Sequence, residues 1–210
     1  PSQWCKANIN NKAADINGDG EITVSDLSAF SYLLLNGGTS SAKSRKVMMN
    51  NTAAPCVISI SDMEIVPGGE TIATISISNP DVKFSSYQFD LILPLGLSVK
   101  TDEDGFLASE LSLERTNMRK TNFFDSKMID NGVLRVLCAS TNNSAFSGTE
   151  GSVAHITLVA DKNMPAGTYS IGLDKAELTL NGDRTIPEIA SAKIAVAAPT
   201  NIAEAFKSGE

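Results

Sequence analysis

The fold is decided by one stretch in which apolar and polar side chains alternate: Tyr87-Gln88-Phe89-Asp90-Leu91-Ile92-Leu93. Successive side chains of a β-strand point to opposite faces of its sheet. Residues that share parity with Leu91 are therefore expected to point into a core. The even-numbered ones then lie on an exposed outer face: Ser86, Gln88, Asp90 and Ile92. Pro94 ends the strand, because proline cannot donate to the hydrogen-bond ladder of a sheet.

The same two-residue period recurs through the second part of the chain. It predicts strands at 57–61, 71–78, 87–93, 133–140, 152–160, 168–173, 176–181 and 189–196. Asn131-Gly132 and Asn181-Gly182 lie between such runs and predict tight hairpins. No long run of helical period occurs between residues 56 and 196. Many short strands at regular spacing predict a β-sandwich or a jelly roll, so the fold class is mainly β.

Upstream, side-chain oxygens follow the spacing of a calcium-binding loop: Asp15-Ile16-Asn17-Gly18-Asp19-Gly20-Glu21-Ile22-Thr23-Val24-Ser25-Asp26. Gly20 is sixth, where such a loop bends with a positive φ, and Ile22 is eighth, where an apolar side chain usually enters the core. The spacing is that of an EF-hand with Asp in place of the closing Glu. It predicts a Ca²⁺ site with these ligands: Asp15, Asn17, Asp19 and Asp26 through side chains, Glu21 through its carbonyl, and Thr23 directly or through water. The alternative is an Asx- and Gly-rich turn without an ion.

A helix is expected directly after this loop, from Leu27 to Asn36. Leu27, Phe30 and Leu34, with Leu33 beside them, form an apolar stripe at helical spacing, and Asn36-Gly37-Gly38 would cap the end. One loop and one helix cannot bury enough apolar area to fold alone. We therefore expect this module to pack on a further repeat or on the domain that follows.

Composition changes mark four segments. Residues 1–38 hold the loop–helix module, 39–55 read as a polar linker, 56–196 form the sandwich, and 197–210 leave the strand pattern as a tail. Because the chain starts with Pro1 rather than Met, we expect a mature or excised fragment, whose export signal could lie upstream.

Charge and hydropathy exclude two classes of partner. The 210 residues carry a net charge of −7, which argues against nucleic acid, because phosphate requires basic surfaces. No apolar run is long enough to span a bilayer. Of the three cysteines, Cys138 lies in an apolar strand and is expected in the core, whereas Cys5 and Cys56 could pair.

No catalytic constellation is evident. The single histidine, His155, lies in a strand, and no Gly-x-Ser-x-Gly elbow accompanies it, so we expect a non-catalytic protein. Asp102, Glu103 and Asp104 are consecutive and precede a glycine, which indicates a turn or a weak second cation site rather than a glycosidase pair. Carbohydrate binding remains an alternative, with Tyr169 as the candidate contact to a glycan, although aromatic residues make up only 6% of the chain.

The loop, with Val24-Ser25 before its closing Asp26 and one helix after it, resembles a type I dockerin repeat over residues 15–37. Dockerins are calcium modules that bind cohesins in cellulosome-like assemblies. The resemblance implies partner contacts at Val24, Ser25, Ser31 and Tyr32. Dockerins usually carry two repeats, and residues 1–14 hold no second one, so another repeat could lie upstream.

The second part resembles a cohesin-like domain over residues 56–196. These segments carry the resemblance: 66–71 (VPGGET), 87–97 (YQFDLILPLGL), 130–136 (DNGVLRV), 145–151 (AFSGTEG) and 165–169 (PAGTY). It implies a nine-stranded jelly-roll sandwich of the kind found in secreted proteins, with Ser86, Gln88 and Asp90 on the partner-binding strand.

Together these features predict a non-catalytic extracellular or cell-surface scaffold or adhesion protein. A calcium-loaded, dockerin-like helix would dock either on its own sandwich or on another copy, in a cohesin–dockerin-type contact. The alternative is a carbohydrate-binding module of a polysaccharide-utilising system.

Overall fold

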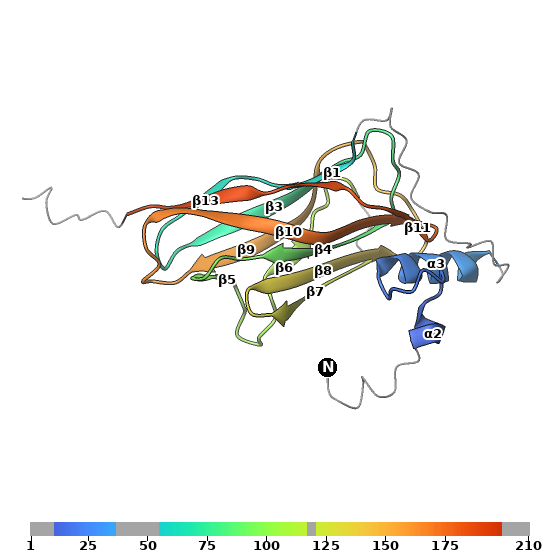
Figure 1. The fold of residues 1–210 in the computed structure, drawn as a ribbon, viewed down its shortest axis with the longest axis horizontal. Helices are drawn as coiled ribbons and strands as arrows, with labels where there is room; N and C mark the ends of the chain where they lie inside the picture. Colours follow the sequence, from blue (N-terminus) through green and yellow to red (C-terminus); the bar gives the residue numbers. More distant parts are fainter. Residues whose placement is uncertain (1–10, 37–54, 117–120, 199–210) are drawn as a thin grey trace, which may run out of the picture.

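Two β-sheets make up the part of the chain after residue 56 (Figure 1). The computed structural model describes residues 11–36, 55–116 and 121–198. Within these ranges the chain is mainly β, as predicted, and two helices, α2 (Asn11–Ala14) and α3 (Val24–Leu35), precede the strands. Among the described residues no helix is long and apolar enough to cross a membrane.

The first sheet has six strands in the order β12-β1-β3-β9-β5, with β6 also paired to β9. Their bounds are β1 (Val57–Ile60), β3 (Glu70–Ser78), β5 (Leu97–Val99), β6 (Ser109–Leu111), β9 (Ser152–Ala160) and β12 (Glu188–Ala190). Strands β3 and β9 form a long antiparallel pair, whereas β1 and β12 run parallel. This sheet forms one wall of the core.

The second sheet has seven strands in the order β2-β13-β10-β4-β8-β7, with β11 paired to the end of β10. Their bounds are β2 (Met63–Ile65), β4 (Ser86–Ile92), β7 (Asn122–Asp130), β8 (Val133–Ser140), β10 (Gly167–Leu180), β11 (Asp183–Thr185) and β13 (Ala192–Val196). The predicted hairpin at 181–182 is confirmed, since Asn181 and Gly182 have φ values of 55° and 89°.

The alternating stretches predict most of the long strands and miss the short ones and β7. The resemblance implies nine strands, whereas the described ranges contain the thirteen of the two sheets. The stretches expected at 168–173 and 176–181 form one strand, β10, with a bulge between Asp174 and Glu177. The strands absent from the prediction are either three residues long or, like β7, lack a clean alternation.

The core lies between the two sheets, as the parity of β4 predicts. Tyr87, Phe89 and Leu91 are fully buried in it, and the Tyr87 hydroxyl donates to the Val153 carbonyl of the opposite sheet at 2.8 Å. Cys138 is fully buried in the same core, as expected. Of the two cysteines that could pair, Cys56 is also buried, and Cys5 lies outside the described residues.

Helix α3 lies against the second sheet, at the end where β10 turns into β11 (Figure 1). It contacts β10, β8, β4 and β11, all on the face of that sheet that points away from the core. The loop and α3 together, residues 15–36, are called the loop–helix unit below. Its position makes the outer face of the second sheet the first candidate for a functional site.

Candidate docking site under the loop–helix unit

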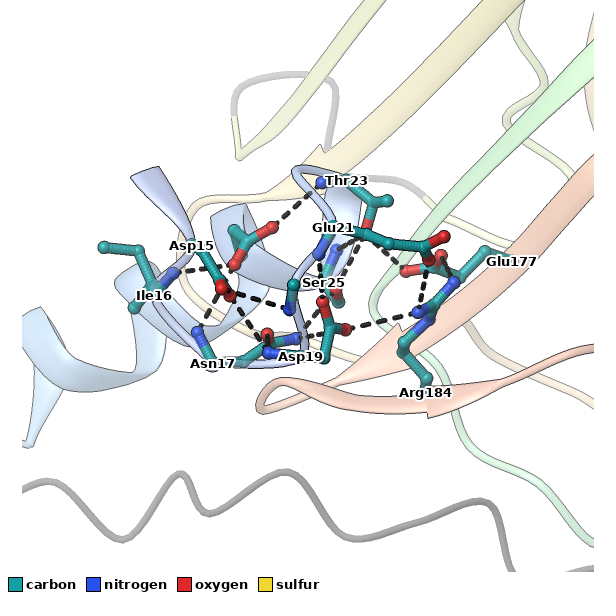
Figure 2. Close-up of polar contacts among 11 residues, drawn as sticks. Asp15, Ile16, Asn17, Asp19, Glu21, Thr23, Ser25, Glu177 and Arg184 are labelled. Atoms are coloured by element: carbon teal, nitrogen blue, oxygen red, sulfur yellow. Dashed lines mark hydrogen bonds and ion pairs between the residues drawn. The ribbon is translucent and has the colours of Figure 1, made fainter. Parts of the chain in front are cut away.

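The loop turns as its glycines predict. Gly18 and Gly20 have φ values of 75° and 89°, a region that glycine enters without steric cost. Asp15 holds the turn closed, because its two carboxylate oxygens accept from the Asp19 and Gly20 amides, each at 3.0 Å (Figure 2). The loop is therefore ordered by hydrogen bonds between its own carboxylates and backbone.

Asp26 caps the helix that follows. Thr23 is the N-cap, and its side chain and that of Asp26 form a reciprocal capping box. The other Asp26 oxygen accepts from the Ile16 amide at 2.7 Å. Because of this cap, α3 begins at Val24, three residues before the predicted start at Leu27.

These oxygens suit calcium by type, and their arrangement in this loop does not. Three carboxylates and one amide are the hard ligands that calcium prefers. However, each carboxylate accepts from backbone amides: Asp15 from Asp19 and Gly20, Asp19 from Glu21, and Asp26 from Ile16, Asn17 and Thr23. Among the described residues, no three acidic, histidine or cysteine side chains converge on a point that could hold a metal. The predicted calcium site therefore stays a prediction.

Helix α3 turns its small polar side toward the sandwich and its apolar side away, which corrects the sequence interpretation. Val24 and Ala29 are fully buried, as are Ser25 and Ser28. By contrast Phe30 and Leu34 are 46% and 67% exposed. Small side chains allow the helix to approach the sheet closely, so the predicted apolar stripe does not make the contact. Ile22, expected in the core, is 52% exposed.

The four residues of the loop–helix unit that were predicted to contact a partner thus differ in burial. Val24 and Ser25 do face a protein surface, but it is the chain's own sandwich, and neither is exposed for another partner. Ser31 and Tyr32 are half-buried. The contact expected in cis or in trans is therefore made in cis in this structure.

Polar bonds join the loop–helix unit to β10 and its hairpin. Thr23 donates from its hydroxyl to Glu177 Oε1 at 2.9 Å (Figure 2). The Gly182 amide donates to Ser28 Oγ at 3.2 Å. Ala29 lies directly above Gly182, where an added Cβ would come within 2.9 Å of the Ala29 Cβ. The absence of a side chain at Gly182 is thus what lets the helix rest on the hairpin.

Arg184, on β11, connects three carboxylates at this contact (Figure 2). Its guanidinium lies 3.2 Å from Asp19 and 2.8 Å from Glu21, both in the loop, and 2.8 Å from Glu177 on β10. Burial raises the pKa of Glu177, and Arg184 and the Thr23 and Ser25 hydroxyls offset part of that rise. The cluster is the main electrostatic link between the loop and the sandwich.

On β4, the predicted outward residues lie on the outer face, but of the four only Ile92 is exposed. Ser86, Gln88 and Asp90 are all buried, because α3 covers this face and because Arg135 covers Asp90 with two hydrogen bonds of 2.7 and 2.8 Å. The expectation of an open, solvated face is therefore wrong. Glu177 pairs with Gln88, and Thr179 with Ser86, so β10 and β4 present one continuous polar surface. We call the outward side chains of β10, β4 and β8 the docking face.

Beside the loop, the docking face continues into an open groove of about 590 Å³. Gln88, Arg135 and Glu177 line it from the sheet, and Glu21 and Ile22 from the loop. Its walls therefore carry charges of both signs together with an exposed apolar side chain. This is the part of the docking face that the loop–helix unit leaves open.

The other candidate residues do not form a reactive site. His155 Nδ1 lies 3.3 Å from the Thr74 hydroxyl. This strand histidine therefore has a hydrogen-bond partner, as expected. Burial raises the pKa of the Cys138 thiol to about 12, and Cys138 and His155 belong to different sheets. Asp102 closes a turn by accepting from the Asp104 and Phe106 amides. Tyr169, the candidate for a glycan contact, is half-buried and donates to the Pro165 carbonyl.

Comparisons with known proteins place the sandwich among cohesins by fold. No protein-family model and no curated protein matches the sequence. The seventh ScaB type I cohesin from Pseudobacteroides cellulosolvens is 19% identical, covers 70% of this chain and 95% of its own, and has a TM-score of 0.56. A non-cellulosomal cohesin from the archaeon Archaeoglobus fulgidus is 16% identical, over 75% of this chain and 99% of its own, with a TM-score of 0.53.

A third similar structure is a type I cohesin–dockerin complex from Clostridium thermocellum, whose matching chain is 15% identical, covers 69% of this chain and 100% of its own, and has a TM-score of 0.56. The sandwich thus has the cohesin fold, as predicted from its sequence segments. At these identities the likeness concerns the fold alone. The dockerin-like nature of residues 15–36 stays a prediction.

Sequence reasoning missed Arg184, Glu177 and Ser28, which make the contact. No local motif identifies them: Ser28 lies on a helix face expected to be solvated, and Glu177 follows a bulge that reverses strand parity. The one available signal was Asn181-Gly182, which places residues 177 and 184 on opposite arms of one hairpin.

Proposed function

We propose that this protein is a non-catalytic protein-interaction module of the cohesin type, whose docking face receives a calcium-loop helix. The observation that carries the proposal is the docked loop–helix unit itself: Thr23, Ser28 and Asp19 bond to Glu177, Gly182 and Arg184 across the contact. A face that already accepts one such helix has the shape and the bonding groups to accept another.

Two further features belong to the same proposal. The loop of residues 15–26 binds calcium, since its ligand types and its glycine turns suit that ion. The protein works outside the cell or at its surface, as a scaffold or adhesion component, where calcium at millimolar levels fills even weak sites. The partner is then a dockerin-like module, supplied by the chain itself or by another molecule.

A competition experiment tests the docking face. Ala29→Arg in the full chain places a long cation between α3 and Gly182 and should expel the chain's own helix while leaving the face intact. A fluorescently labelled peptide of residues 15–36 should then raise its anisotropy with the Ala29→Arg chain and much less with the wild type, whose face is occupied. The matched control is the same peptide carrying Ala29→Arg, which should bind neither chain. Equal, negligible binding of the unmodified peptide to both chains would count against the proposal.

A further inference from the structure

Strand β7 is the last strand of the second sheet, and among the described residues no strand pairs with its far edge (Figure 1). The Thr141 amide, just after β8, donates to the Thr121 carbonyl, just before β7. Since alternate residues of an antiparallel pair bond to the neighbouring strand, the odd-numbered residues of β7 bond to β8 up to the bulge. The backbone groups of Phe124, Ser126 and Met128 therefore point away from β8. An edge of this kind is a template for pairing with another chain.

We propose that β7 pairs antiparallel with the β7 of a second copy of this chain, about a two-fold axis at Ser126. The inference goes beyond the proposed function, because it concerns the edge of the second sheet and not the docking face. In the pair, the second sheets of the two copies join into one. The two-fold axis of such a pair stands perpendicular to the sheet, so both docking faces point to the same side. The dimer therefore presents two docking faces side by side.

The first support is that the charges of β7 are complementary to themselves. The strand reads Asn122-Phe123-Phe124-Asp125-Ser126-Lys127-Met128-Ile129-Asp130. In antiparallel pairing centred on Ser126, Asp125 of each copy comes opposite Lys127 of the other. Opposite charges directly across a strand pair stabilise it, and symmetry makes the favourable pair occur twice.

The apolar side chains of β7 match in the same register. Phe124 comes opposite Met128 on the side of the sheet that faces the core, where Phe124 already packs against it. Phe123 comes opposite Ile129 at each end, and both are exposed in the single chain. The bulge between Met128 and Asp130 then ends the regular ladder. The proposed pair thus covers apolar surface that the single chain leaves in water.

The second support is that Lys127 lacks a counter-charge in the single chain. Its cross-strand neighbour on β8 is Arg135, a like charge, and Arg135 is bonded to Asp90. Within the described ranges neither Lys127 nor Asp125 belongs to an ion pair. Asp125 instead accepts from the Ser126 amide at 2.8 Å. A second copy would give Lys127 a carboxylate and would give the Ser126 amide a backbone acceptor.

The third support is that the charges select one register. A two-fold pairing centred on Asp125 would bring two carboxylates together, and one centred on Lys127 would bring two ammonium groups together. Like charges directly opposite each other destabilise a strand pair. Charged residues on an edge strand usually prevent pairing, and here they prevent the wrong registers while favouring one.

The dimer is expected to be weak and reversible. One strand pair is a small contact, and it belongs with the interfaces below about 1,200 Å² that form transiently. The Ser126 amide must also leave Asp125 before it can bond to the second copy. We therefore expect monomers in the micromolar range and dimers as the concentration approaches millimolar.

The test is sedimentation equilibrium of the full chain over that range of concentration, with charge reversals on β7. Asp125→Lys and Lys127→Asp should each weaken self-association by at least about tenfold, because each places like charges opposite each other. An equimolar mixture of the two variants should associate as the wild type does, since every pair across the axis is then of opposite sign. The matched control is Lys193→Asp, the same change at an exposed position of β13 on the other side of the same sheet, which should leave the dimer unchanged.

A second readout follows the edge itself. Hydrogen exchange at the Phe124 and Met128 amides should slow as the concentration of the wild type rises, and it should not slow in either variant alone. A wild type that stays monomeric up to millimolar concentration would overturn the inference, even if the edge bound a segment of another protein. Dimers that form equally well in both variants would also overturn it, because they would use another surface, such as the docking face. The proposed function is judged separately by the peptide experiment, in which β7 takes no part.

Discussion

Arg115 shows how much of this sandwich depends on a single charged side chain. The residue is 2% exposed, and its guanidinium donates to the carbonyls of Ser147, Ile77 and Gly148 and to Asn79 Oδ1 at 2.7–2.9 Å. It also lies 5.2 Å from the centre of the Phe84 ring. It ties the loop after β8 to the end of β3.

Arg115→Met should therefore lower the free energy of unfolding by about 3 kcal/mol, because the buried acceptors lose their donor. Chemical denaturation of the full chain measures this. Lys100→Met is the control: it breaks an exposed pair with Glu70 and should cost less than about 0.5 kcal/mol. Similar losses in the two variants would refute the structural role of Arg115.

Glu177 should make the free energy of unfolding depend on pH. Burial raises its pKa above the ordinary glutamate value of 4.5. A carboxyl with a higher pKa in the folded chain binds its proton more tightly there, so the free energy of unfolding falls as the pH rises from 4.5 through the raised value. Its neighbours are Arg184, Thr23 and Ser25, with Asp19 and Glu21 bonded to the same guanidinium.

Glu177→Gln removes this titration and keeps the size of the side chain. The stability of the wild type relative to Glu177→Gln should therefore be greatest at the acidic end of that range and should decrease as the pH rises. Urea denaturation of both proteins across the range measures the difference. A relative stability that increases with pH would show that pairing with Arg184 outweighs burial at Glu177.

At the scale of elements, the fit of α3 on the β10–β11 hairpin depends on Gly182. Gly182→Ala should cost about 1 kcal/mol for its φ of 89° and more for the 2.9 Å approach to Ala29, so α3 should become easier to detach. Gly105→Ala is matched, since Gly105 has a φ of 85° and open space around it. Hydrogen exchange of the α3 amides should accelerate only in Gly182→Ala. Equal acceleration in both variants would mean that strain, not contact, is responsible.

Most long strands could be predicted from alternation, because one face of each is buried and the period is then visible. Residues 71–78, 133–140 and 152–160 match β3, β8 and β9 closely. Helix α3 was also predictable, but its orientation was not. Amphipathicity predicts that Phe30 and Leu34 face the protein, and only the small residues opposite them fit on the hairpin. The contact depends on tertiary geometry that no local pattern encodes.

On the scale of the whole molecule, the hydrophobic core is continuous within the sandwich and ends there. Every residue of the core cluster lies between Cys56 and Val196, and Val24 and Ala29 of α3 are not among them. Apolar burial is the main source of folding free energy and of cooperativity. The sandwich and the loop–helix unit therefore share polar bonds and only slight apolar contact, and we expect them to open separately.

Native-state hydrogen exchange at increasing denaturant tests this separation. Amides of α3 should exchange through a local opening of low free energy and small denaturant dependence, whereas those of β3 and β9 should require global unfolding. Ala29→Arg should lower the opening free energy of α3 and leave that of β9 unchanged, because the core does not include this helix. If α3 and β9 instead share one opening free energy, the loop–helix unit is a fixed part of the fold. Its release could then not expose the docking face without unfolding the sandwich.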